Sequence, residues 1–68
     1  MLQHGHITAL LAYCEATAIK AQKMADTYER LGCASNAARQ IGVVEAMADM
    51  QQKLRRILLA QVAVDAAV

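Results

Sequence analysis

Two histidines and two cysteines are the side chains in this sequence best suited to metal binding or nucleophilic chemistry. His4 and His6 stand one residue apart, so their imidazoles can share a metal in an extended segment, but a structural zinc site needs about four ligands. Cys14, the nearest thiol, follows about two helical turns later within an apolar pattern. The spacing therefore predicts no metal centre, and it leaves open whether His4 and His6 bind a metal by themselves.

The same residues do not form a catalytic arrangement. Both histidines stand before or at the start of the first predicted helix, and Cys14 falls where a small core residue is expected, so no base stands beside a nucleophile. Cys14 and Cys33 are separated by roughly 28 Å if they lie along one helix, whereas a disulfide requires Cα atoms within about 7 Å. We expect two reduced thiols in a cytoplasmic protein, no cofactor, no catalytic residue and no enzymatic activity.

Composition and charge indicate one small all-helical domain. The 68 residues are 57% hydrophobic, yet they include no Phe, Trp or Pro. A net charge of +1 provides no strong field for nucleic acid or an anionic membrane. The most apolar stretch, residues 57–68, is shorter than the ~20 residues that span a bilayer. It therefore predicts a buried helix end rather than a membrane anchor.

A heptad pattern predicts two helices that pack along a seam, because apolar or small residues recur at alternating spacings of three and four. In the first predicted helix, about residues 6–32, the seam is Ile7, Leu10, Cys14, Thr17, Ala21, Met24, Tyr28 and Leu31, flanked by Leu11, Ala18 and Ala25. In the second, about residues 36–66, the pattern places the seam at Gln40, Val43, Met47, Met50, Leu54, Ile57, Gln61, Val64 and Val68, flanked by Val44 and Leu58.

A turn at Gly32 separates the two helices. Glycine just after a helix adopts the left-handed conformation that ends it, and Ser35 or Asn36 is then a suitable N-cap for the second helix. The short connection predicts an antiparallel hairpin. Gly42 costs up to about 1 kcal/mol relative to Ala, which suggests a kink or a close contact near the start of the second helix.

Two pairs of opposite charge stand four residues apart in the favourable order, Asp26 with Arg30 and Asp49 with Lys53. We expect each pair to form an ion pair on an exposed side of its helix.

A two-helix hairpin leaves one side of each helix open, and the second helix is expected to overhang the first by about two turns. Apolar stripes left exposed in this way usually mark an interface. We expect pairing into a homodimeric four-helix bundle, with wrapping around a different helical protein as the alternative; the relative direction of the two hairpins stays open. The residues expected to mediate self-association are Leu10, Cys14, Met24, Tyr28, Met47, Met50, Leu54 and Ile57.

In length and helix plan the chain resembles two groups of small proteins. One group is the ROP-type RNA-binding hairpins, which dimerise into four-helix bundles. The other is the two-helix co-chaperones of type III secretion needle subunits, which it also resembles in the short Gly-containing turn and the Ala-rich second helix, from Glu45-Ala46-Met47 to Ile57-Leu58. Small phage-encoded inhibitors share the outline. The resemblance rests on helix plan rather than on a motif, so it assigns no residue a role.

The predicted function is protein binding, in which an apolar helical face occludes or chaperones a partner protein. The partner surface is expected at Ile19, Arg55, Arg56, Leu59 and Val62. The alternative is a ROP-like dimer that binds RNA or DNA through basic patches centred on Arg55 and Arg56, although no aromatic residue is interleaved with them.

Overall fold

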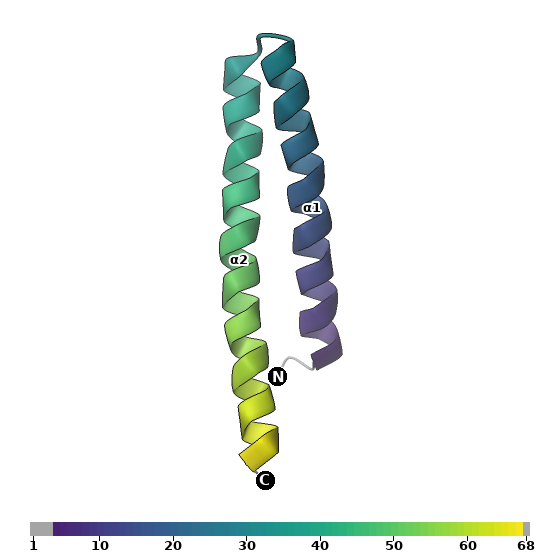
Figure 1. Ribbon diagram of the computed structural model, residues 1–68, viewed down its shortest axis with the longest axis vertical. Coiled ribbons are helices and arrows are strands. Elements are labelled where there is room, and N and C mark those ends of the chain that lie inside the picture. The colour runs from purple at the N-terminus through teal and green to yellow at the C-terminus, as the bar shows by residue number, and fades with distance from the viewer. Residues whose placement is uncertain (1–3, 68) are drawn as a thin grey trace.

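Two antiparallel helices pack side by side in this protein. The computed structural model describes residues 4–67, in which α1 (His4–Arg30) and α2 (Ala34–Ala67) form a rod of 56 × 16 × 15 Å (Figure 1). The predicted all-helical hairpin is confirmed. Within residues 4–67, neither helix contains a stretch that is both long and apolar enough to cross a membrane.

The two helices differ in length, so one end of the rod is a single helix. α1 has 27 residues and α2 has 34, a difference of about 10 Å at 1.5 Å per residue. The C-terminal end of α2 accordingly extends past the start of α1 (Figure 1). Val64 is 63% exposed on this overhang. Val68, which the heptad pattern placed there too, lies outside the described residues.

Gly32 ends α1 in the way that the sequence predicts. Its φ is +77°, and its N–H donates to the carbonyl of Glu29 at 3.1 Å. The N–H of Cys33 donates to the carbonyl of Tyr28 at 2.8 Å. These two bonds define a Schellman motif, which satisfies carbonyls that the last turn of a helix otherwise leaves unpaired.

The start of α2 corrects the predicted N-cap. The N–H of Ala37 donates to the carbonyl of Cys33 at 3.0 Å, so Cys33 is the capping residue and neither Ser35 nor Asn36 has that role. The helix therefore begins at Ala34, directly after the residue whose N–H completes the Schellman motif. The loop between the helices is therefore only residues 31–33.

Small side chains allow α1 and α2 to approach closely near the turn. Ala21, Ala25 and Ala37 are at most 3% exposed. Larger side chains meet further from the turn, where Ile7, Cys14 and Leu54 form a buried cluster. Partly buried apolar side chains pack against this cluster from both helices: Leu11, Met47 and Leu58.

The seam is rotated relative to the prediction. Ala25, placed on the flank of the seam, is 0% exposed, whereas Leu10 and Leu31, placed within it, are 40% and 69% exposed. In α2, the flanking Leu58 is half-buried and the seam residue Ile57 is exposed. Because Ala18 and Ala25 are small, α2 packs closest over their flank, which leaves the bulkier flank of α1 uncovered.

One of the two predicted ion pairs forms. Lys53 Nζ lies 3.0 Å from Asp49 Oδ2. Asp26 Oδ1 instead accepts a hydrogen bond from Gln22 Nε2 at 3.1 Å, and the Arg30 guanidinium donates to Thr27 Oγ1 at 3.3 Å. The predicted pair between Asp26 and Arg30 is therefore wrong, because polar neighbours within the same turns take both side chains.

Replacing either of two glycines by alanine should change the stability of the hairpin, in opposite directions. A Cβ at Gly42 would meet nothing within 4 Å, so the expected close contact is wrong and Gly42→Ala should raise the free energy of unfolding by up to about 1 kcal/mol. Gly32→Ala should lower it by about 1 kcal/mol, because a Cβ is strained at a φ of +77°. Urea denaturation followed by circular dichroism measures both changes. A loss of stability in the Gly42 variant would contradict the open surroundings of that position.

Thiol reactivity should separate the two cysteines, because Cys14 is buried and Cys33 is exposed. A chromogenic disulfide reagent should label Cys33 rapidly in the native protein and Cys14 only as the hairpin opens. The variant Cys33→Ser isolates the slow phase, and denaturant should make both thiols fast. Equally rapid labelling of Cys14 in the native state would contradict its place between the helices.

Candidate protein-binding face

The uncovered flanks of the two helices lie on the same side of the hairpin. A residue three positions after a seam residue is displaced by about 60° around the helix. In two antiparallel helices that bury the same heptad stripe against each other, this displacement points to one common side. The two rows of uncovered residues therefore form one surface rather than two.

We call this surface the open face. Its members stand three residues after the seam residues Ile7, Cys14, Ala21 and Tyr28 of α1 or Gln40, Met47, Leu54 and Gln61 of α2, and most are apolar. It comprises Leu10, Thr17, Met24 and Leu31 of α1 with Val43, Met50, Ile57 and Val64 of α2. Met50 and Ile57 are 45% and 41% exposed, so each keeps a large apolar area available for contact.

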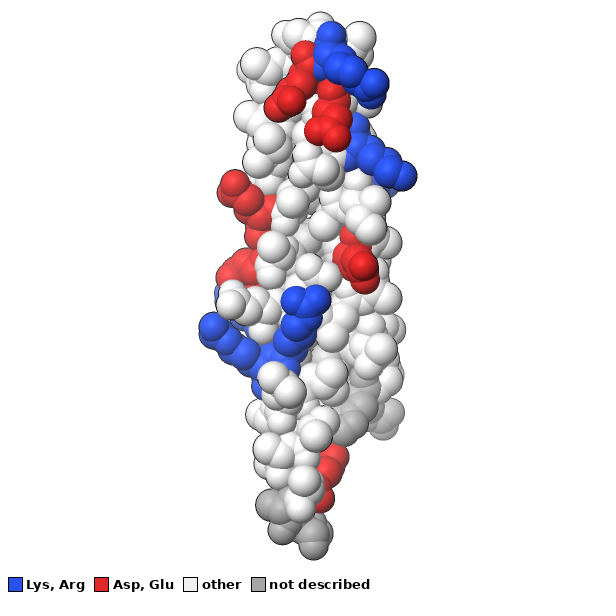
Figure 2. Space-filling view, in the orientation of Figure 1, with Lys and Arg blue, Asp and Glu red and all other residues white. Residues whose placement is uncertain are grey.

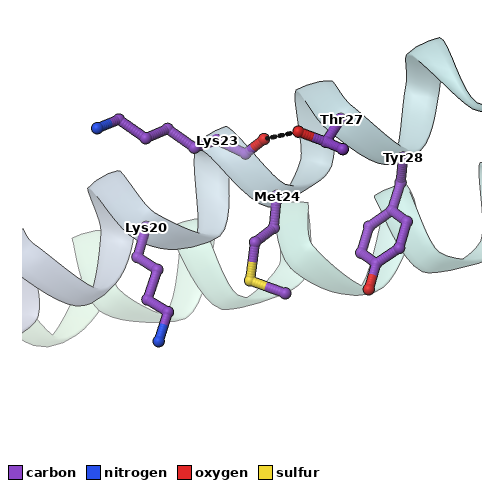
Figure 3. Close-up of a pocket in the computed structure, with 5 residues that line it drawn as sticks. All are labelled: Lys20, Lys23, Met24, Thr27 and Tyr28. Carbon is purple, nitrogen blue, oxygen red and sulfur yellow. Dashed lines mark hydrogen bonds between the residues drawn. The ribbon is translucent and has the colours of Figure 1, made fainter.

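A shallow pocket of about 300 Å³ opens beside Met24 on the α1 side of the open face. Met24 and Tyr28 supply its apolar part, and Lys20, Lys23 and Thr27 border it. Figure 3 shows Met24, Tyr28 and Lys20 extending to the same side of α1, with Thr27 Oγ1 hydrogen-bonded to the Lys23 carbonyl at 3.0 Å. The pocket has an apolar floor with the Lys20 side chain beside it, whereas the Lys23 side chain extends away from Met24 and Tyr28 (Figure 3), and this arrangement suits an apolar side chain with an acidic one beside it.

Basic residues border the open face. Lys20, Arg39 and Lys53 each stand one residue before a buried or half-buried seam position, which places them on the outer edge of this face. No Asp or Glu among the described residues occupies the open face or this edge. Asp49 partly neutralises Lys53 through their ion pair, whereas no ion pair involves Lys20 or Arg39 within the described part of the chain.

The opposite side of the hairpin carries acidic residues, and we call it the acidic face. Glu15 and Glu29 stand one residue after the seam residues Cys14 and Tyr28. Asp26 and Glu45 stand five residues after seam residues, so all four acidic side chains point away from the open face. Arg55 is the basic residue at an equivalent position. Figure 2 shows acidic side chains along both helices, with basic groups among them, on the side of the rod that it presents. The protein thus has two chemically different faces.

The residues predicted to mediate self-association divide into three sets. Cys14 and Leu54 are buried between the helices of one chain, so they have no surface to offer a second copy. Leu10, Met50 and Ile57 lie on the open face and are exposed. The remaining three are half-buried at or beside its inner border: Met24, Tyr28 and Met47.

Four of the residues predicted to bind a partner share the side of the acidic face, because Ile19 and Leu59 stand five residues after Cys14 and Leu54, and Arg55 and Val62 stand one residue after a seam residue. Ile19 lies on α1, about 20 Å along the axis from the level of Leu59. Leu59 and Val62 are 68% and 48% exposed on α2, and Arg55 lies on the acidic face near them. Arg56 points outward, away from α1.

The placement of Arg55 and Arg56 does not favour nucleic-acid binding. Both side chains are exposed, but the acidic face that contains Arg55 also contains Glu15 and Glu45. These carboxylates repel a phosphate backbone that approaches from that side.

Apolar periodicity alone does not identify the basic residues that border the open face or its pocket. Lys20, Lys23 and Arg39 were not among the expected binding residues, although they border the pocket or the face. The signal that finds Lys20 and Arg39 is their heptad position: each precedes a seam residue by one, as Lys53 does, whereas Glu15 and Glu29 follow a seam residue by one.

The histidines and cysteines form no reactive cluster in the described part of the chain. His6 is exposed, the side chain of His4 lies outside the described residues, and Cys14 is enclosed by apolar neighbours. Within residues 4–67, no three or more side chains of the kinds that bind metals lie together. The open face is therefore the surface with the strongest claim to a function.

Comparison with protein-family models, with curated proteins and with solved structures found no match for this chain.

Proposed function

We propose that this protein is a small protein-binding module that uses its open face to cover an apolar helical surface of a partner, as an inhibitor or co-chaperone does. Two copies cover each other's open face when no partner is bound. The observation that carries the proposal is the row of mainly apolar residues on the open face, among them Leu10, Met24, Met50 and Ile57, which contains no charged residue and lies opposite the acidic face. An exposed apolar surface of this extent is typical of an interaction site.

The dimensions of the open face suit a reversible interaction. The rod is about 16 Å wide and α1 is about 40 Å long, so the face measures roughly 600 Å². Stable complexes of standard size bury about 800 Å² on each partner. The open face is somewhat smaller, which favours exchange between a second copy and a partner over permanent assembly.

The shape of the open face favours a helix as the bound element. The side chains of α1 and α2 form two parallel ridges, and the partly buried seam residues Tyr28 and Met47 lie lower between them. A third amphipathic helix fits between two such ridges, as in a three-helix bundle. Binding in this way hides the partner's own apolar stripe, which is the physical basis of occlusion and of chaperoning.

Substitutions on the open face test this proposal. Met50→Gln with Ile57→Gln should reduce binding of a synthetic amphipathic helix, with a Leu stripe bordered by Gln, by at least about tenfold, because two central apolar contacts are lost. Fluorescence anisotropy of the labelled helix measures the change. The same variant should shift the mass measured by light scattering from about 15 kDa, twice the 7.3 kDa of one chain, to that of a monomer.

The matched control is Leu59→Gln with Val62→Gln, which alters two similarly exposed apolar residues of α2 away from the open face. This variant should bind the helix and self-associate like the original protein, and circular dichroism should show the same helicity in all three proteins. If the control loses binding while the open-face variant retains it, the partner surface is the one around Leu59 and Val62 and the proposal is wrong.

A further inference from the structure

We infer that the open face prefers a partner helix whose apolar stripe is bordered by Asp and Glu. This inference rests on the proposed function, and it adds the chemistry of the partner. The observation behind it is the separation of charge in the hairpin: the open face has a basic border, and the acidic residues Glu15, Asp26, Glu29 and Glu45 point away from it.

Charge complementarity favours the acidic helix. The Lys20 side chain extends to the same side of α1 as Met24 and Tyr28, which form the floor of the pocket (Figure 3). A partner that places an apolar side chain in this pocket brings its own bordering residues within reach of Lys20. Arg39 and Lys53 supply the same sign of charge along α2. Opposite charges at the border of an interface favour encounter and select against partners with the wrong sign.

A second copy fits the open face less well than such a helix. When two hairpins pair through their open faces, the basic borders of both copies meet, and the four carboxylates of each acidic face remain on the outside. Lys20 and Arg39 then find no opposite charge across the interface. Self-association is thus opposed by like charges, and an acidic helix is able to displace the second copy.

An anionic membrane is also a poorer match. Proteins that lie on a bilayer insert large apolar side chains, commonly Trp, Phe and Leu, into the headgroup boundary. The chain has no Trp or Phe, and Met24 and Tyr28, which form the floor of the pocket, are half-buried. Such recessed side chains contact an inserted helix more readily than a lipid surface.

Three synthetic helices of about 21 residues, roughly 30 Å long, test the inference with the intact protein. They share one Leu stripe and differ only in whether Glu, Gln or Lys borders it. At about 0.15 M salt the Glu helix should bind about tenfold more tightly than the Gln helix, and the Lys helix more weakly than both. At about 1 M salt the three affinities should agree within about twofold, since screening removes the contribution of the border.

Variants of the protein locate the effect. Lys20→Gln with Arg39→Gln should reduce the preference for the Glu helix over the Gln helix to about threefold or less. Arg55→Gln with Arg56→Gln removes the same net charge away from the open face and should leave the preference unchanged. Light scattering should show that self-association strengthens as salt is added, whereas binding of the Glu helix weakens.

The outcomes separate this inference from the proposed function. Equal binding of the Glu and Gln helices at low salt overturns the inference and leaves the proposed function intact. Failure of the folded protein to bind any of the three helices overturns both. Binding to phosphatidylcholine vesicles that contain phosphatidylserine, in preference to the Glu helix, overturns the inference in favour of a membrane surface.

Discussion

Every residue classed as buried in the described hairpin lies along the single contact between α1 and α2. A helix in a larger bundle buries two flanks of its apolar stripe against two neighbours, but each helix here has one neighbour. The contact therefore takes the seam and one flank, from Ile7 to Ala25 on α1, and leaves the other flank in solvent. The open face follows from this geometry. The apolar stripe of each helix consists of the seam and a flank on either side, and a single neighbouring helix covers only the seam and one flank.

The positions of the charged residues make the two sides of the hairpin different. The short loop, with its Schellman bonds at Gly32 and Cys33, orients the helices so that both uncovered flanks share one side. The basic edge at Lys20 and Arg39 and the acidic side around Glu15 and Glu45 then become properties of the whole rod rather than of either helix. A net charge of +1 conceals this separation, because the two faces nearly cancel in the sum. The functional proposal accordingly depends on the position of each charge and not on their number.

The sequence predicted the helices and their turn well, and it predicted local polar contacts and the orientation of the seam less well. Gly32 ended α1 as expected because only the backbone conformation at one residue was at issue. The flexible side chains of Asp26 and Arg30 can each contact several polar neighbours. Heptad spacing does not determine which of these contacts forms. The pattern also marked both flanks of the seam as apolar.

Which flank faced α2 depended on how closely the two backbones approach, which is a property of both helices together. The small residues Ala18 and Ala25 decided it, since they allow the closer packing. For the same reason the open face was only partly predictable: Leu10, Met50 and Ile57 were expected to bind another chain, but so were Cys14 and Leu54, which the hairpin buries within itself.

The distribution of large and small residues along the seam has a consequence for how the hairpin folds. The alanines nearest the turn close the shortest loop but bury little area, whereas Ile7 and Leu54 bury the most and are 47 residues apart in the sequence. Closing that longer loop costs about 1 kcal/mol more in chain entropy than closing one of about 12 residues between Ala25 and Ala37. Zipping from the turn therefore gains little until the distant cluster forms, so the two helices should assemble in one cooperative step whose transition state already contains contacts between the chain's far ends.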